Sequence, residues 1–187
     1  TIEFWANISA EGTIYYQSQN DISTYGAVNT YIDIIVTASL IRMDFNGAFI
    51  KVDKDMTSYF NNWTHFAFTY VNSATNNSDA GNIYINGNKE TTLFGSSGGG
   101  VFYNGTSAYG VAVIGRRYDA SPFYFDGELK NLRVYNSVKT YSDITNSLLS
   151  KNTIKVKNTY LQPKFDGLIG NESFTFNGSS DYFEIPE

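Results

Sequence analysis

Side chains that could take part in covalent or acid–base chemistry are few in this chain. Cysteine is absent, which excludes a thiolate nucleophile and a thiolate metal site. His65 is the only histidine, and it could serve a catalytic triad only if a carboxylate oriented it beside a serine or threonine. Because His65 lies in the middle of a predicted strand, we interpret it as a structural histidine, hydrogen-bonded between sheets.

Paired carboxylates are not evident either. Asp53 and Asp55 would share one strand face, but they lie beside Lys51 and Lys54 and fit a solvated turn. The tract of glycine and serine at residues 95–100 lacks the Lys-Ser/Thr of a phosphate-binding loop, and we expect a flexible connector too irregular for a strand. We therefore expect no acid pair in a cleft, no catalytic residue and no enzymatic activity.

Binding chemistry is better represented, because aromatic and polar side chains gather in the predicted loops. An aromatic platform beside amide, guanidinium and carboxylate groups is typical of a sugar-binding surface. The candidate ligand-binding residues are Tyr25, Tyr103, Asn104, Tyr109, Arg116, Arg117, Tyr118 and Asp119. The alternative is that the loop tyrosines only pack on the rim of the domain.

A calcium ion is the one cofactor that the sequence leaves open. Hard oxygen ligands suit this ion, and the weak candidates to supply them are Asn20, Asp21, Asp79 and Asp119. Each of these residues is also a common turn residue.

Size and charge narrow the class of protein further. A chain of 187 residues fits one β-sandwich domain, and its net charge of −5 disfavours nucleic acid as a partner. No apolar run approaches the ~20 residues of a membrane-spanning helix.

Alternation of apolar and polar residues indicates strands along nearly the whole chain. We expect Asn-Gly turns at 46–47 and 86–87, an Asp-Gly turn at 126–127, and one helix at 140–149. The expected core residues are Phe4, Phe66, Phe68, Ile83, Ile85, Ile114, Leu132 and Val134. The expected strands are residues 1–6, 12–16, 31–38, 40–45, 48–52, 62–71, 82–86, 110–115, 123–125, 128–135 and 174–185.

Four segments carry a family resemblance. They are Thr1-Ile-Glu-Phe-Trp5, Trp63-Thr-His-Phe-Ala-Phe-Thr-Tyr70 with Asn82-Ile-Tyr-Ile-Asn-Gly87, Val113-Ile-Gly115, and Phe125-Asp-Gly-Glu-Leu-Lys-Asn-Leu-Arg-Val-Tyr135. In this order and spacing they resemble laminin-G-like, concanavalin A-like (pentraxin-like) jelly rolls. The resemblance implies an all-β fold, a two-sheet antiparallel jelly-roll sandwich with one short helix.

The resemblance also bears on function. Glycosidases of this fold carry a Glu-x-Asp-x-x-Glu strand, which this chain lacks. The positions of the family's calcium-binding aspartates fall near Asn29 and Tyr109 here. Neither residue is a carboxylate, so the family's calcium site is not expected in this chain. The implied function is a non-enzymatic recognition domain that binds glycan or protein on an extracellular, cell or virion surface. A structural capsid, fibre or array module is the alternative, and a glycoside hydrolase-like enzyme comes third.

The C-terminal segment departs from the family's order. Residues 171–187 resemble the family's usual first strand, although they lie at the end of this chain. A circular permutation, a slice of a tandem array and a strand donated to neighbouring copies or domains would each explain this. We expect residues 174–185 to form one strand beside 128–135, with Thr1 and Glu187 at the same end of the sandwich.

Overall fold

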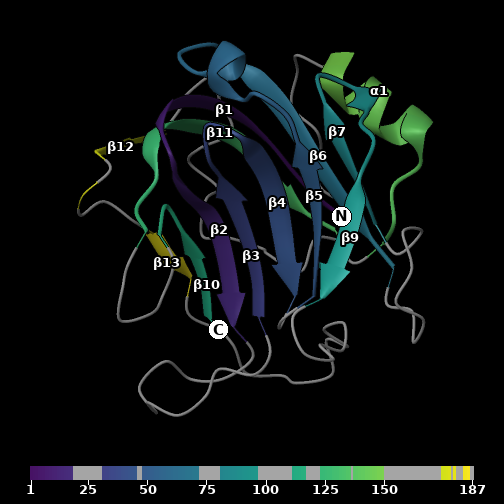
Figure 1. Ribbon diagram of the computed structural model, residues 1–187, viewed down its shortest axis with the longest axis horizontal. Helices are drawn as coiled ribbons and strands as arrows, with labels where there is room; N and C mark the ends of the chain where they lie inside the picture. The colour runs from purple at the N-terminus through teal and green to yellow at the C-terminus, as the bar shows by residue number, and fades with distance from the viewer. Residues whose placement is uncertain are drawn as a thin grey trace.

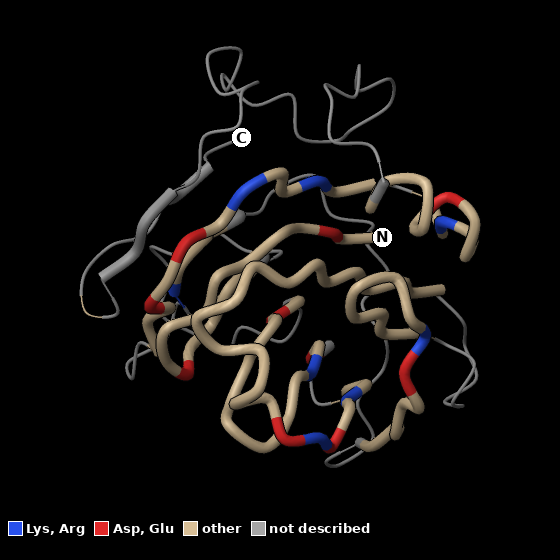
Figure 2. The backbone as a smooth tube through the Cα atoms, turned by 90° about the horizontal axis from the view of Figure 1, so that it is seen from above, with Lys and Arg blue, Asp and Glu red and all other residues tan. Residues whose placement is uncertain are grey.

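A computed structural model shows two antiparallel sheets packed face to face (Figure 1). It describes residues 1–18, 31–45, 48–71, 81–96, 111–116, 123–135, 137–149, 174–177, 179 and 183–185. Seen from above, the strands form curved layers, with acidic and basic residues scattered along the backbone (Figure 2).

Sheet A has six strands in the order β12-β11-β1-β6-β7-β8. Their bounds are β12 Phe174–Asn177, β11 Asp126–Val134, β1 Ile2–Ala10, β6 Thr64–Tyr70, β7 Gly81–Ile85 and β8 Asn88–Lys89.

Sheet B has seven strands in the order β13-β10-β2-β3-β4-β5-β9. Their bounds are β13 Phe183–Ile185, β10 Val111–Ile114, β2 Gly12–Ser18, β3 Tyr31–Val36, β4 Leu40–Phe45, β5 Ala48–Asp53 and β9 Leu93–Ser96. A 3₁₀ turn, η1, spans Thr57–Tyr59 and one helix, α1, spans Tyr141–Leu149. The predicted two-sheet antiparallel sandwich with one helix is confirmed.

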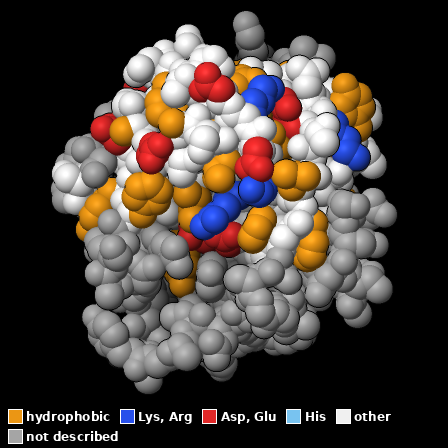
Figure 3. Space-filling model, viewed as in Figure 1, with side chains coloured by type: hydrophobic (Ala, Val, Ile, Leu, Met, Phe, Trp, Pro, Cys, Tyr) orange, Lys and Arg blue, Asp and Glu red, His pale blue; other side chains and the backbone are white. Residues whose placement is uncertain are grey.

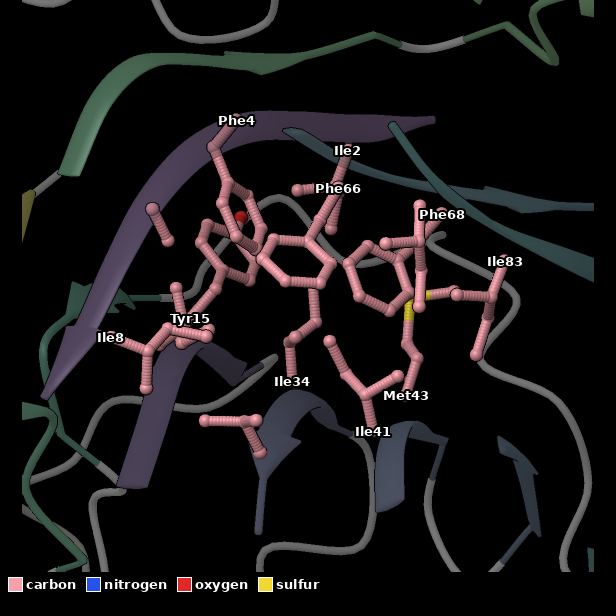
Figure 4. Packing of buried hydrophobic residues seen from close by; sticks show 14 of the residues in the cluster. Ile2, Phe4, Ile8, Tyr15, Ile34, Ile41, Met43, Phe66, Phe68 and Ile83 are labelled. Carbon is pink, nitrogen blue, oxygen red and sulfur yellow. The ribbon is translucent and has the colours of Figure 1, made fainter. Parts of the chain in front are cut away.

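The core lies between the sheets, where alternate residues of each strand meet. Phe4 packs against Phe66 and Phe68, with ring centroids 5.8 and 5.9 Å apart, and sheet B supplies Tyr15, Ile34 and Met43 from the opposite side (Figure 4). Six of the eight predicted core residues are buried, and Leu132 and Val134 pack half-buried against them. This agreement follows from the period of two, which sends every second side chain inward.

Helix α1 packs on the outer face of sheet A. Its start is fixed by a reciprocal cap, in which Asp143 N–H donates to Thr140 Oγ1 (3.2 Å) and Thr140 N–H donates to Asp143 Oδ2 (2.9 Å). Ile144 is buried in a small cluster with Ala67 of β6 and Tyr84 of β7. The one helix predicted in this strand-rich chain is therefore confirmed.

Three local predictions were wrong. Gly95 belongs to strand β9 and is not part of a connector, because it pairs with Phe49 of β5 and leaves room for that residue's ring. Gly127 lies inside β11 with φ at +147°, where an added Cβ would overlap the Asn7 carbonyl oxygen of β1. Residues 123–125 form no strand, only isolated bridges at Tyr124.

The predicted Asn-Gly turn at 86–87 is confirmed, because Asn86 and Gly87 both have positive φ.

The C-terminal segment contributes to both sheets. Phe174–Asn177 pairs antiparallel with β11, as predicted, but Phe183–Ile185 pairs with β10 in sheet B, so the predicted single strand is two strands. The turn at 46–47 and Glu187 lie outside the described residues, and the origin of the strand order stays a prediction.

Removal of this segment tests its role. We expect the chain truncated after Gly170 to unfold at a clearly lower urea concentration than the intact chain. A large apolar side chain contributes roughly 1.5 to 3 kcal/mol when it is buried, and loss of the segment bares an edge of each sheet. Urea unfolding followed by circular dichroism at several protein concentrations is the measurement.

The outcomes are separable. A truncated chain as stable as the intact one would show that β12 and β13 add nothing to the core. A transition of the intact chain that depends on protein concentration would show exchange between copies.

Candidate functional site

Of the eight predicted ligand-binding residues, the structure describes only Arg116. It follows β10, is half-buried and forms an antiparallel bridge with Tyr124. Tyr25, Tyr103, Asn104, Tyr109, Arg117, Tyr118 and Asp119 lie outside the described residues, as do the weak metal candidates Asn20, Asp21 and Asp79. The candidate binding surface among the described residues therefore consists of side chains that were not predicted to bind a ligand.

The outer face of sheet B carries a continuous row of side chains. Residues that pair across six neighbouring strands share one face, because paired residues point to the same side of a sheet. From β10 to β9 the row is Val113, Tyr16, Asp33, Asp44, Phe49 and Gly95. It places two carboxylates next to an aromatic ring in the middle of the face.

The two carboxylates face each other across β3 and β4. Asp33 is fully buried and Asp44 is 7% exposed. Like charges directly opposite each other are unfavourable, and Arg42 offsets this by an ion pair from Nη2 to Asp44 Oδ2 at 3.0 Å. In the sequence, Asp33 has no second carboxylate on its own strand. Only the register between β3 and β4 reveals that Asp44 lies opposite it.

Phe49 forms the aromatic part of this surface. Its ring lies across Gly95, where a Cβ would overlap the ring atoms. The Arg42 guanidinium and the Lys51 ammonium each lie 5.9 Å from the ring centroid. Two paired cations, Arg42 and Lys51, therefore lie beside one aromatic ring.

Both cations are partly accessible to solvent. The side chains of Arg42 and Lys51 are 33% and 26% exposed, and Lys51 Nζ pairs with Asp53 Oδ2 at 2.8 Å. Basic, acidic and hydrophobic side chains gather on the front of this face (Figure 3). We call Arg42, Asp44, Phe49 and Lys51 the sheet B platform. It offers hydrogen-bond donors, acceptors and an apolar ring within one rigid surface.

The other outer face holds a buried charged cluster around Glu3. Glu3 Oε1 accepts hydrogen bonds from Arg133 Nη1 (3.0 Å) and Tyr135 Oη (2.9 Å). Glu3 Oε2 accepts one from Ser147 Oγ of α1 (2.7 Å) and lies 3.7 Å from His65 Nε2. Burial alone would raise the pKa of Glu3, but its contacts with His65, Ser147, Arg133 and Tyr135 lower it to about 2.

This cluster contains a serine, a histidine and a carboxylate, yet it is not a nucleophilic triad. In a triad the histidine contacts the hydroxyl, whereas Ser147 donates to Glu3 here. His65 Nδ1 is buried with no hydrogen-bond partner among the described residues. We predicted that His65 lies between the two sheets, and this location was wrong. His65 lies on the outer face of sheet A, where it pairs with Trp5 and the two ring centroids are 5.4 Å apart.

Two kinds of feature are absent from the part of the chain that the structure describes. Within these ranges no group of three or more His, Asp or Glu side chains comes together in a way that could hold a metal ion. Of the helical segments that the structure describes, none is long and apolar enough to cross a membrane.

Comparison with known proteins fits the fold. A laminin-G family model described as the concanavalin A-like lectin/glucanases superfamily matches residues 1–145. The chain therefore belongs to this superfamily, within the class of concanavalin A-like jelly rolls that the sandwich defines. No curated protein matches it.

A solved structure shares the architecture. The chain is similar to the CBM40 domain of the Ruminococcus gnavus IT-sialidase, solved bound to alpha2,3 sialyllactose. The TM-score is 0.54 at 13% identity, over 79% of this chain and 80% of that one. At this identity the likeness establishes a shared fold.

The buried carboxylate predicts an acid dependence of stability. Because the pKa of Glu3 falls from 4.5 to about 2 on folding, its contribution is fully present above pH 4.5 and is lost as the pH falls toward 2. We expect Glu3→Gln to cost roughly 3 kcal/mol at pH 7 and almost nothing near pH 2. Urea unfolding at both pH values measures this.

Glu90→Gln is the control, because it breaks the more exposed pair with Lys54 at 3.0 Å and should cost about 1 kcal/mol or less. Equal losses in the two variants at pH 7 would contradict a special role for Glu3.

Proposed function

We propose that this chain is a non-enzymatic glycan-binding domain of an extracellular or cell-surface protein, with its ligand on the sheet B platform. The observation that carries the proposal is the Phe49 ring, which lies across Gly95 beside the paired cations Arg42 and Lys51. Phe49 is half-buried, so a ligand stacked on its ring would bury further apolar area next to charged groups.

The chemistry of the platform suits a sugar. The apolar face of a pyranose ring can stack on Phe49, while neighbouring hydroxyls donate to Asp44 and accept from Arg42 or Lys51. The ion pairs at 3.0 and 2.8 Å hold these groups in place before the ligand arrives, so little conformational entropy is lost on binding. The superfamily's lectins and the sialyllactose-bound neighbour support the same ligand class.

We further propose that the predicted loop residues extend the platform toward the ligand. These are Tyr25, Tyr103, Asn104, Tyr109, Arg116, Arg117, Tyr118 and Asp119. They would add the amides and tyrosine rings that the described face lacks, and a calcium ion held by Asp119 or its neighbours would be compatible with this role.

Glycoside hydrolysis is the second candidate, and the facing pair Asp33 and Asp44 is what favours it. A retaining enzyme needs one carboxylate as nucleophile and one as acid, both in contact with the sugar. Asp33 is fully buried, and Asp44 is held by Arg42 at 3.0 Å. A lectin-like role therefore agrees better with this pair than catalysis does.

A glycan array followed by titration calorimetry tests the proposal. We expect Phe49→Ala and Arg42→Ala each to weaken binding of the best array glycan at least about tenfold, because each removes a central contact. Gly95→Ala should also weaken it, since the new methyl group displaces the Phe49 ring.

Val138→Ala is the control, because Val138 is an exposed apolar residue that follows β11 of sheet A and should leave affinity at the sheet B platform unchanged. Assembly of the chain into larger particles without binding any array glycan would instead support a structural module. Release of reducing sugar that is lost in Asp33→Asn would establish the enzyme.

A further inference from the structure

Both tryptophans of the chain lie outside the core. The sequence has two, Trp5 and Trp63, and both are half-buried on the outer face of sheet A, while phenylalanines fill the interior. Trp5 points outward from β1 because its neighbours Phe4 and Ala6 point inward. Trp63 precedes β6 by one residue and keeps the phase of His65, which pairs with Trp5.

A lysine joins the two rings. Lys130 of β11 pairs with Trp5 of β1, and its ammonium lies 5.8 Å from the centroid of the Trp5 ring and 3.8 Å from that of Trp63. Since β11 and β6 flank β1 on opposite sides, the Lys130 side chain crosses β1 to reach Trp63. The three side chains therefore form one continuous surface over three strands.

Polar groups lie next along the same strands. Asn7 pairs with Glu128, two residues beyond Trp5 and Lys130, and Asn7 Nδ2 donates to Glu128 Oε2 at 3.0 Å. The far end of the sheet is covered by α1, where Ser147 donates to Glu3. The surface of Trp5, Trp63 and Lys130 with its Asn7–Glu128 rim is called the tryptophan face.

We propose that the tryptophan face is a second glycan-binding platform, on the side of the sandwich opposite the sheet B platform. It offers two large rings for the apolar faces of pyranose units, with an ammonium, an amide and a carboxylate for their hydroxyls. Those polar groups favour a sugar over an apolar protein surface. The exposed large hydrophobic residues of the described chain, Val71, Leu93, Val138 and Tyr141, belong to other parts of the surface.

Two platforms on opposite faces give the domain a property that one site lacks. A short glycan cannot contact both outer faces of a sandwich, so each platform engages its own chain or its own branch. The domain therefore bridges two glycans, or binds a dense glycan surface more tightly than either platform does alone.

The experiment separates the platforms by combining variants with fluorescence. Wild type, Phe49→Ala, Trp63→Phe, Lys130→Ala and the combination of Phe49→Ala with Trp63→Phe are labelled and applied to one glycan array. Circular dichroism checks that each variant is folded. Lys130→Ala keeps both rings, so it tests the face even where a tryptophan substitution disturbs folding.

The expected result is that Phe49→Ala retains at least one bound glycan, whose signal falls about tenfold in Lys130→Ala or Trp63→Phe and is lost in the combined variant. Because both tryptophans lie on this face, titrating that glycan into Phe49→Ala should change the intrinsic tryptophan emission. A glycan bound only at the sheet B platform should leave the emission unchanged.

Each contrary outcome has a distinct meaning. Loss of all glycan binding in Phe49→Ala overturns the second platform and leaves the first in place, and it would assign the tryptophan face to packing against another protein. Unchanged binding in Phe49→Ala with loss in the tryptophan-face variants would overturn the sheet B platform alone. A wild-type chain that binds no glycan overturns both.

Discussion

The packing of two sheets against each other divides the residues of their strands into an inward and an outward set. The inward set is almost entirely apolar, and it forms one cluster that reaches from Ile2 to Leu129. Everything that could recognise a ligand is thereby confined to the two outer faces and the loops. The two faces differ in the described part of the chain, where helix α1 covers part of the sheet A face.

On sheet A, the cover depends on Glu3. Its carboxylate connects β1 to Arg133 and Tyr135 near the end of β11 and to Ser147 of α1, so one buried charge holds the helix on the sheet. The cost of burying it is offset by three hydrogen-bond donors. The rest of that face, with Trp5 and Trp63, stays open to solvent in part, as do Arg42, Phe49 and Lys51 on sheet B.

Much of this fold could be predicted from the sequence, because its signals are local. Alternation predicted most of the strands and the core phenylalanines, and the helix predicted at 140–149 begins within one residue of its observed start. The platform could not be predicted, because it depends on register between strands. Asp33 meets Asp44, and Phe49 meets Gly95, only once β3, β4, β5 and β9 are aligned. In the sequence, a glycine that makes room for an aromatic ring cannot be distinguished from a glycine of a flexible loop.

The central claim is that the outer face of sheet B holds the ligand through Phe49 and its flanking charges. A crystal structure of the domain with its preferred glycan tests this most directly. The account predicts a pyranose ring stacked on Phe49 with hydroxyls hydrogen-bonded to Arg42 and Asp44. A glycan held elsewhere, with Phe49 bare at saturating ligand, would contradict it.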